Sequence, residues 1–355
     1  MKHLAPTSIV ALLTLAVCAE THALVVQKQK KTTPKSAPQK GSGAIVMGTH
    51  QLPGEFGAFG KEYTIGTGLL LNFNLVSAEY RADRFVGENS VGETFSWVPL
   101  KNQKILILRY TVQNPNPKDT RLWYMSFKFT VVSADDQNSE QVNHPWIGNN
   151  TKYQEMLLKP AQKVTLTAAI LVPSQGEVPK LIVQNGFDDK AAVVRFDLRG
   201  KVKRMADPAW SLNGIDTLDT LDAKLDTYYP WGGSDIQVNG IEELGATYGD
   251  LRAEMGQKLV AIKLKARGIT PVPSRLWYGE FGAKIKTSDG ETTEVRPYNN
   301  LLRGGRPEVF DGVVPVGDEQ SLRLVASIPS TASIESLKLT FKNYEDIRRT
   351  YSFKL

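Results

Sequence analysis

The feature that most constrains this chain is a stretch of sequence that occurs twice. Residues 103–137 (QKILILRYTVQNPNPKDTRLWYMSFKFTVVSADDQ) align without a gap with residues 257–291 (QKLVAIKLKARGITPVPSRLWYGEFGAKIKTSDGE). Both copies contain the tetrapeptide Arg-Leu-Trp-Tyr, at 121–124 and at 275–278. Two matched segments of this length indicate that one structural unit occurs twice in the chain.

The spacing of apolar residues around the tetrapeptide predicts that both copies form β-strands. Apolar side chains recur at every second position, and successive side chains of a strand point to opposite faces of a sheet. In the first copy these positions are Leu106, Leu108, Tyr110, Val112, Trp123, Met125, Phe127, Phe129 and Val131, and in the second they are Val260, Ile262, Leu264, Ala266, Trp277, Gly279, Phe281, Ala283 and Ile285. Because matched parity implies matched cores, we expect Trp123 and Trp277 to lie in the interior.

The first 43 residues have the composition of an export signal followed by a tether. Residues 1–23 combine a basic start at Lys2 with an apolar run from Ile9 to Ala19, which is the layout of a secretory signal peptide. The run is shorter than the ~20 residues that a membrane-spanning helix needs, and no later segment is long enough. Residues 24–43 are rich in Lys, Gln, Pro, Ser and Thr, and they predict a disordered basic linker. We therefore expect an exported protein of the periplasm, the cell surface or the extracellular space.

Charge and cysteine content exclude two classes of function. The formal net charge is +6, but six lysines and one glutamate precede Ala44, so the rest of the chain is close to neutral. A globally basic domain would favour nucleic acid, and we expect no such partner. The single cysteine is Cys18, in the apolar N-terminal run, so the folded part has no disulfide and no cysteine-based zinc site. Leu15-Ala16-Val17-Cys18 resembles a bacterial lipoprotein box and leaves lipidation open.

Alternating segments beyond the repeat predict an all-β chain built from two tandem immunoglobulin-like β-sandwiches related by internal duplication. Each copy has about seven short strands separated by turn signals. Residues 44–200 are expected to form the first sandwich, 201–235 a joint and 236–355 the second sandwich. Leucine and isoleucine at helical spacing favour a short helix in the joint. These residues are Ile215, Leu218, Leu221 and Leu225.

The first copy places its strands and turns in a definite order. The strand Gln103–Val112 is followed by Arg121–Gln137, and Leu158–Lys163 then opens a strand that ends at Pro173. This order resembles that of exported bacterial immunoglobulin-like domains of unknown function, which are often borne on lipoproteins. Such domains typically place a proline-glycine turn before the last of these strands, where this chain has Pro160 followed by Ala161. The resemblance implies export and a sandwich fold, and it implies no activity.

The sequence lacks the common catalytic, metal-binding and nucleotide-binding motifs, so we expect a chain that is not an enzyme and holds no metal or cofactor. Beyond the linker the only histidines are His50 and His144, and no His-x-x-x-His pair occurs. The Gly-x-Ser-x-Gly elbow, the P-loop and the dinucleotide fingerprint are also missing from the sequence. We therefore expect no catalytic residues. A carboxylate pair for glycoside hydrolysis remains open, because its members can lie far apart in the chain.

Two loops supply the candidate binding residues. In the first copy, Trp146 follows His144 in an asparagine-rich loop, where an indole could stack on a sugar. In the second, Tyr298, Arg303 and Arg306 lie in a basic loop that could bind an anionic glycan or phosphate. We expect a non-catalytic envelope protein that acts in binding, adhesion or assembly, with an envelope protein or glycan as its partner. The alternative is a carbohydrate-binding protein that uses these loop aromatics or the basic loop.

Overall fold

The computed structural model describes most of the chain from residue 56 onward. The described ranges are 56–88, 94–140, 146–147, 155–187, 190–205, 210–269, 274–295, 297–343 and 346–355. All of the described residues belong to one compact unit, residues 41–355. The predicted signal peptide and linker lie outside the described residues, so both stay predictions.

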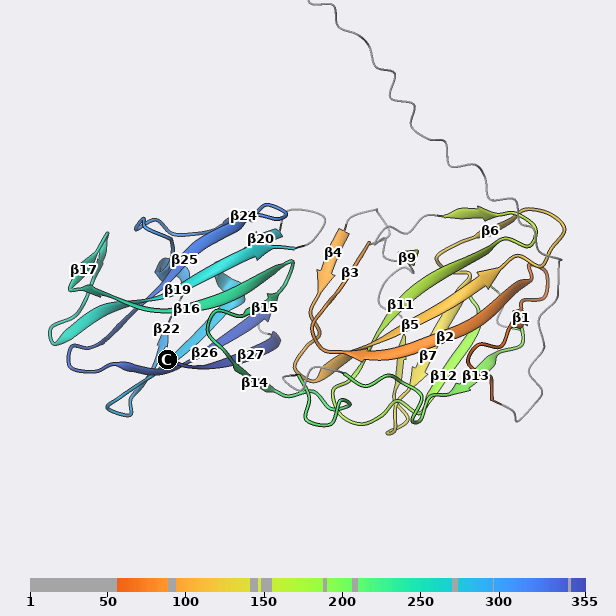
Figure 1. Ribbon diagram of the computed structural model, residues 1–355, viewed down its shortest axis with the longest axis horizontal. Coiled ribbons are helices and arrows are strands. Elements are labelled where there is room, and N and C mark those ends of the chain that lie inside the picture. The colour runs from red at the N-terminus through yellow and green to blue at the C-terminus, as the bar shows by residue number, and fades with distance from the viewer. Residues whose placement is uncertain are drawn as a thin grey trace, which may run out of the picture. The chain divides into compact units, whose positions relative to one another are not determined.

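Two antiparallel sheets form the first half of this unit, in the orders β1-β2-β5-β11-β9 and β13-β12-β7-β8 (Figure 1). The strands are β1 (Tyr63–Ile65), β2 (Leu71–Arg81), β5 (Gln103–Gln113), β7 (Phe127–Val132), β8 (Asn138–Glu140), β9 (Trp146–Ile147), β11 (Lys163–Pro173), β12 (Lys180–Asn185) and β13 (Val194–Asp197). Phe73 and Tyr110 of one sheet pack against Phe129 and Phe196 of the other in one buried cluster. The two sheets therefore form a β-sandwich.

The second half has the same architecture, with the sheets β15-β16-β19-β25-β23 and β14-β27-β26-β21-β22. Its strands are β14 (Thr220–Ala223), β15 (Tyr228–Trp231), β16 (Ser234–Gly245), β19 (Gln257–Gly268), β21 (Phe281–Thr287), β22 (Thr292–Val295), β23 (Leu301–Arg303), β25 (Glu319–Pro329), β26 (Ile334–Asn343) and β27 (Asp346–Lys354). The core is centred on Trp231, which stacks on Phe281 with ring centroids 4.5 Å apart. The prediction of an all-β chain of sandwiches is confirmed.

The two sandwiches repeat fine details of strand pairing. A β-bulge interrupts the pairing of β2 with β5 at Val76, and a bulge at Asn239 interrupts the matching pair β16 and β19. Tyr63 and Tyr229 occupy matching places in β1 and β15. Each hydroxyl accepts a hydrogen bond of 2.8 Å from the backbone N–H five residues earlier, and each ring packs edge-on against a phenylalanine of the facing sheet. The repeated segments therefore have the same topology in both halves.

Short elements complete each sandwich. They are the hairpins β3 (Phe85–Glu88) with β4 (Thr94–Trp97) and β17 (Thr247–Tyr248) with β18 (Leu251–Arg252), the pairs β6 (Thr120–Leu122) with β10 (Met156–Leu158) and β20 (Ser274–Leu276) with β24 (Gly312–Val314), the 3-10 turn η1 (Tyr278–Glu280) and the single helical turn α1 (Pro297–Asn300). The first hairpin covers apolar side chains on the outer face of β5, and the second does the same for β19. Among the described residues, no helix has the length and apolarity to cross a membrane.

The helix expected in the joint is wrong for its described part. Thr220–Ala223 form β14, which pairs in parallel with β27 instead. Leu221 is buried in the second core by this pairing. Burial against β27 outweighs the helical spacing of the leucines, because local preference is a weak determinant of structure.

The interior placement expected for the two tryptophans is also wrong. Trp123 is 41% exposed and Trp277 is half-buried, whereas Leu122 and Leu276 are buried beside them. The strands β6 and β20 end just before each tryptophan, and a turn separates them from β7 and β21. The alternation of side chains does not continue across that turn, because a change in backbone direction breaks the parity of a strand.

Ala161 occupies a turn position that favours glycine. Its φ is +60°, and Gly317 at the matching place before β25 has a φ of +80°. Both backbone N–H groups donate a similar hydrogen bond, Ala161 to Asn114 at 2.9 Å and Gly317 to Gly268 at 3.0 Å. The left-handed conformation costs an L-residue roughly 1–2 kcal/mol, so the first copy carries backbone strain that the second does not.

We predict that Ala161→Gly stabilises the protein. Glycine relieves the strain but adds entropy to the unfolded chain, so we expect a net gain of about 1 kcal/mol. The midpoint of urea unfolding measures this gain. Ala246→Gly is the control, since Ala246 lies in a turn and is not among the residues with positive φ. A loss of stability in Ala161→Gly would contradict the assigned turn.

Candidate functional site

Two consecutive arginines of β27 join the second sandwich to the first. The guanidinium of Arg349 is buried and donates to the backbone carbonyls of Ala82 at 2.9 Å and Leu100 at 3.2 Å. Arg348 donates to the carbonyl of Val98 at 3.0 Å and lies over the ring of Trp97. Burial lowers the pKa of Arg349 to about 10, so the side chain stays charged at neutral pH. Carbonyls of the first sandwich thus replace the water around a charge from the second.

A third arginine makes the reverse connection. Arg84 of the first sandwich is buried, forms an ion pair with Asp235, and donates to the carbonyl of Gly232 at 2.8 Å. Desolvation lowers the pKa of Arg84, and the neighbouring Asp235 opposes that shift. Asp235 also pairs with Arg267 at 3.1 Å. Each sandwich therefore supplies a buried arginine that binds the other.

We predict that Arg349→Leu destabilises the protein by about 3 kcal/mol, because it leaves buried carbonyls without a donor. The change is read from the midpoint of chemical unfolding. Arg199→Leu is the matched control, since Arg199 is an exposed arginine whose ion pair with Asp197 should contribute little. An equal, small effect of both variants would contradict a joint held by Arg349.

A groove of about 1020 Å³ lies beside this joint and is lined by both sandwiches. The first sandwich contributes the outward side chains of β2 and β5 together with the start of the β3 hairpin. The second contributes the β14–β15 segment. The charged and phenolic side chains of the lining include Arg81, Arg84, Arg109, Asp222, Lys224, Tyr228 and Asp235. Its volume is that of a ligand pocket, and such pockets occur preferentially at domain interfaces.

The charges of the groove divide into a paired set and an unpaired set. Arg81 makes two hydrogen bonds to Asp83, at 2.6 and 3.0 Å. Within the described part of the chain, no hydrogen bond or ion pair holds the side chains of Arg109, Asp222 or Lys224. These three side chains are exposed at the groove. They are therefore the groups that a ligand could reach without first breaking an existing pair.

An aromatic wall closes one side of the groove. The ring of Tyr228 lies 4.1 Å from the guanidinium of Arg267, and its hydroxyl hydrogen-bonds Glu319. Desolvation and the bond to Glu319 raise the pKa of Tyr228 to about 12, so the phenol stays neutral. Tyr229 and Trp210 also line the groove and pack on Tyr351 of the second core. The rings of this wall are therefore held by contacts with the second sandwich, beside a charged floor.

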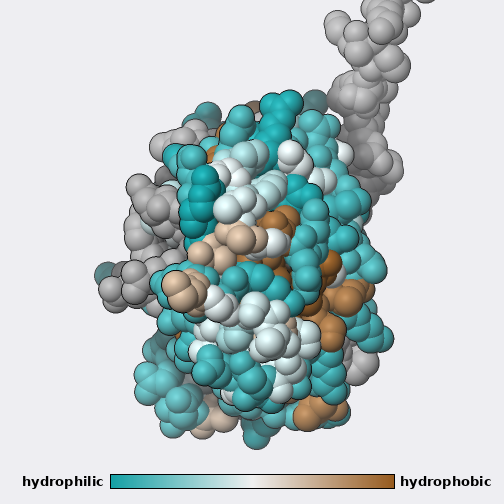
Figure 2. All heavy atoms as spheres, turned by 90° about the vertical axis from the view of Figure 1, so that its left-hand side faces the viewer, coloured by the Kyte–Doolittle hydropathy of each residue, from teal (hydrophilic) through white to brown (hydrophobic). Residues whose placement is uncertain are grey.

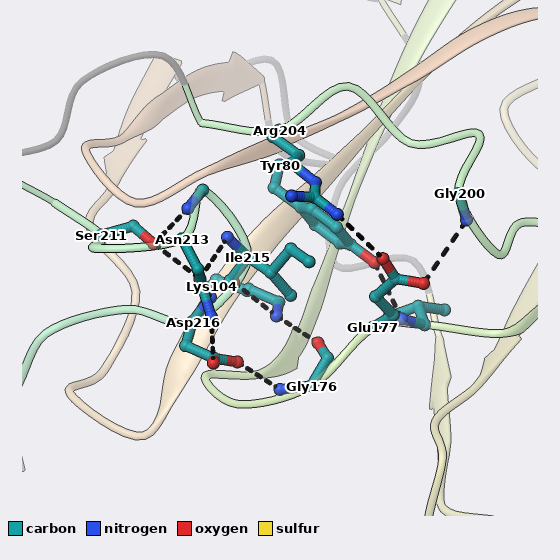
Figure 3. Close-up of polar contacts among 12 residues, drawn as sticks. Tyr80, Lys104, Gly176, Glu177, Gly200, Arg204, Ser211, Asn213, Ile215 and Asp216 are labelled. Carbon is teal, nitrogen blue, oxygen red and sulfur yellow. Dashed lines mark hydrogen bonds and ion pairs between the residues drawn. The ribbon is translucent and has the colours of Figure 1, made fainter.

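Figure 3 shows a second polar cluster, centred on the fully buried Lys104 of β5. Its ammonium donates to the carbonyls of Gly176 at 2.5 Å and Ile215 at 2.8 Å, and it lies 4.5 Å from the ring centre of Tyr80. Burial lowers the pKa of Lys104 to about 8, with Asp216 opposing the shift. Because no part of this lysine reaches solvent, the cluster is a structural tie between the joint and the first sandwich.

The residues expected to bind ligand are only partly placed. His144 lies outside the described residues, and only the backbone is described for Trp146, in β9, and Tyr298, in α1. Arg303 and Arg306 are exposed in one turn, where Arg303 lies 3.9 Å from Glu308 and over the ring of Phe310. Neither Arg303 nor Arg306 lines the groove, and the role of all five residues stays a prediction.

The residues of the groove, and those that connect the two sandwiches, were not predicted from the sequence. Arg349 has the same parity in β27 as the buried Tyr351 and Phe353, so the sequence already indicated that its side chain faces inward. Arg109 could be recognised as an outward charge in an apolar strand. No signal shows that β2 and the β14–β15 segment, more than 130 residues apart in the sequence, line one groove.

An exposed aromatic cluster lies elsewhere on the first sandwich. Trp123 contacts Phe187 edge-on with ring centroids 6.4 Å apart, and Trp123, Met125 and Phe187 are between 41 and 57% exposed. The guanidinium of Arg121 lies 5.4 Å from the Trp123 ring and 3.9 Å from Glu155. We call Trp123, Met125 and Phe187 the aromatic patch.

Exposed apolar residues of the second sandwich include Met255, Val309 and Val313, and none of them is aromatic. Figure 2 shows the end of the molecule that carries β17 and β19, where the surface is mostly hydrophilic and a narrow apolar band crosses it.

Among the described residues, no group of three histidine, cysteine, aspartate or glutamate side chains is placed to hold a metal ion.

Glu280 is a half-buried carboxyl beside the second tryptophan. Burial raises its pKa to about 7, and a hydrogen bond from the backbone amide of Trp277 partly opposes the shift. The unfolded carboxyl titrates near 4.5. The folded state therefore binds more protons between pH 4.5 and 7, and stability falls as the pH rises through that window.

We predict that Glu280→Gln stabilises the protein at pH 8 by an amount on the order of 2 kcal/mol. The amide keeps an acceptor for Trp277 but carries no charge to desolvate. At pH 4 the two proteins should be equally stable, since the wild-type carboxyl is then neutral. Thermal unfolding at both pH values measures this, and a gain that is equal at pH 4 and pH 8 would contradict the assigned shift.

Comparisons with known proteins assign no family to this chain. No family model matches the chain, and no curated protein matches it. An uncharacterized β-sandwich protein from Clostridium difficile 630 is 12% identical over 39% of this chain and 98% of its own, with a TM-score of 0.28. A putative lipoprotein from Bacillus subtilis is 12% identical over 38% of either chain, with a TM-score of 0.25. At these scores the similarity indicates no activity.

Proposed function

We propose that this chain is a non-catalytic exported binding protein that holds its partner in the groove between two β-sandwiches. The observation that carries this proposal is the groove itself, with Arg109, Lys224 and Asp222 unpaired on its surface. Buried arginines fix the two walls, so little conformational freedom is lost when a ligand binds. The partner is a component of the cell envelope.

Internal duplication of an immunoglobulin-like unit is the second part of the proposal. Its support is the repeated tetrapeptide, the matching bulges at Val76 and Asn239, and the matching hydroxyl contacts of Tyr63 and Tyr229. Export is supported by the composition of residues 1–23, and a flexible linker at residues 24–43 would place the sandwiches away from their attachment point.

The alternative function is carbohydrate binding, and one observation favours it. Trp123 is an exposed indole with a neighbouring aromatic ring and a charged pair within reach, which is the combination of apolar face and hydrogen-bonding groups that a sugar requires. The loop residues Trp146, His144, Tyr298, Arg303 and Arg306 remain further candidates for glycan contacts.

Cosedimentation with washed cell envelope tests the groove. We expect the purified protein from residue 24 onward to pellet with envelope from the source organism. The double variant Arg109→Glu, Lys224→Glu should reduce the bound fraction at least about tenfold, because it reverses both free cations. The matched control is Lys338→Glu, Lys354→Glu, which changes the net charge equally on exposed strand positions away from the groove.

Three outcomes decide the proposal. Loss of pelleting in the groove variant alone supports it. Equal loss in both double variants would mean that the loss comes from the change in net charge. Unchanged pelleting of the groove variant would mean that the groove does not bind the partner. Circular dichroism of each variant checks that it is folded.

A further inference from the structure

The two copies place the same tryptophan differently. Trp123 is 41% exposed, while Trp277 at the matching position is half-buried. The backbone around them is the same, because β6 pairs with β10 as β20 pairs with β24. Side chains that differ between the copies must therefore decide where each indole lies.

The first difference is two residues after the tryptophan. Gly279 stands where the first copy has Met125, and a Cβ built on Gly279 would come within 2.5 Å of the Trp277 ring. The Trp277 indole can thus lie against the backbone only because that position has no side chain. The first copy has a side chain at this position, Met125, so the Trp123 indole cannot lie as Trp277 does, and it is more exposed.

The second difference brings another aromatic ring to Trp123. A Cβ on Gly186 would meet the carbonyl oxygen of Met125 at 1.7 Å, so glycine is needed for this close approach of the two chains. The next residue, Phe187, then contacts the Trp123 ring. The matching residues of the second copy are Lys342 and Asn343, and they supply no ring. Two features of the first copy therefore build the aromatic patch.

The surroundings of the patch favour one class of ligand. A stable protein interface buries about 800 Å² on each partner, which three side chains cannot supply. A sugar ring needs less area, since its C–H face can cover a single indole while its hydroxyl groups seek donors and acceptors. Arg121 and Glu155 offer both beside the Trp123 ring, and both are exposed.

We propose that the aromatic patch of the first sandwich is a glycan-binding site for neutral hexose chains. Trp123 stacks on the C–H face of a sugar ring, Phe187 borders it, and Arg121 with Glu155 hydrogen-bonds the hydroxyl groups. At the matching described residues of the second sandwich, Trp277 lies against Gly279 and no neighbouring ring corresponds to Phe187. This inference deepens the carbohydrate-binding alternative and is independent of the groove.

Isothermal titration with cellohexaose, maltohexaose and chitohexaose tests the site. We expect at least one of these sugars to bind, and Trp123→Ala to weaken that binding at least about tenfold, as aromatic stacking in other ligands suggests. Met125→Gly is the sharper variant. It keeps the indole but gives it the space that Trp277 has, so binding should also weaken at least about threefold.

Three variants serve as controls for the aromatic patch. Met255→Gly makes the same substitution at an exposed turn of the second sandwich, and Trp277→Ala removes the other indole; both should leave sugar binding unchanged. The groove variant Arg109→Glu, Lys224→Glu should also bind sugar normally, so the two proposals can fail separately. Absence of binding to all three sugars, or unchanged binding by Trp123→Ala, would overturn the inference. If Trp277→Ala does not fold, Met125→Gly and Met255→Gly still decide it.

Discussion

The contact between the two sandwiches depends on the hydrogen bonds of the buried Arg349 guanidinium. A charge removed from water must find hydrogen-bond partners in the protein, and here the partners are backbone carbonyls at Ala82, Leu100 and Gln103. Those carbonyls belong to the first sandwich, while Arg349 belongs to the last strand of the second. Separating the sandwiches would therefore break these hydrogen bonds and leave water as the replacement partner.

The groove is a consequence of that joint. Its floor is the outer face of β2 and β5, and its wall is the β14–β15 segment, so it exists only while the two sandwiches are held together. Lys104 contributes in the same way, because its ammonium connects the segment around Ile215 to the loop at Gly176. Lys104 thus holds the connecting segment against the first sandwich.

The copies share a scaffold and differ on their surfaces. Strand order, bulges and the tyrosine contacts are common to both, because these features hold each core together. Met125 and Gly279, or Phe187 and Asn343, differ without disturbing any of them. Surface positions can change at little cost to stability, so one of two similar sandwiches can carry a surface cluster that the other lacks. The aromatic patch fits this pattern.

The sequence by itself determined the sheet content and the inward faces of β5, β7, β19 and β21. The alternation of apolar and polar residues is a local property of the sequence, and it predicts the buried face wherever a strand runs without interruption. Tertiary structure decided the rest. Leu221 is in a strand because β27 is there to pair with it, and Trp123 is exposed because a turn and Met125 direct it outward. The contact between the sandwiches and the groove beside it could not be predicted from the sequence. The contact between residues 82 and 349 depends on how the two folded sandwiches pack, and no local pattern of residues encodes that packing.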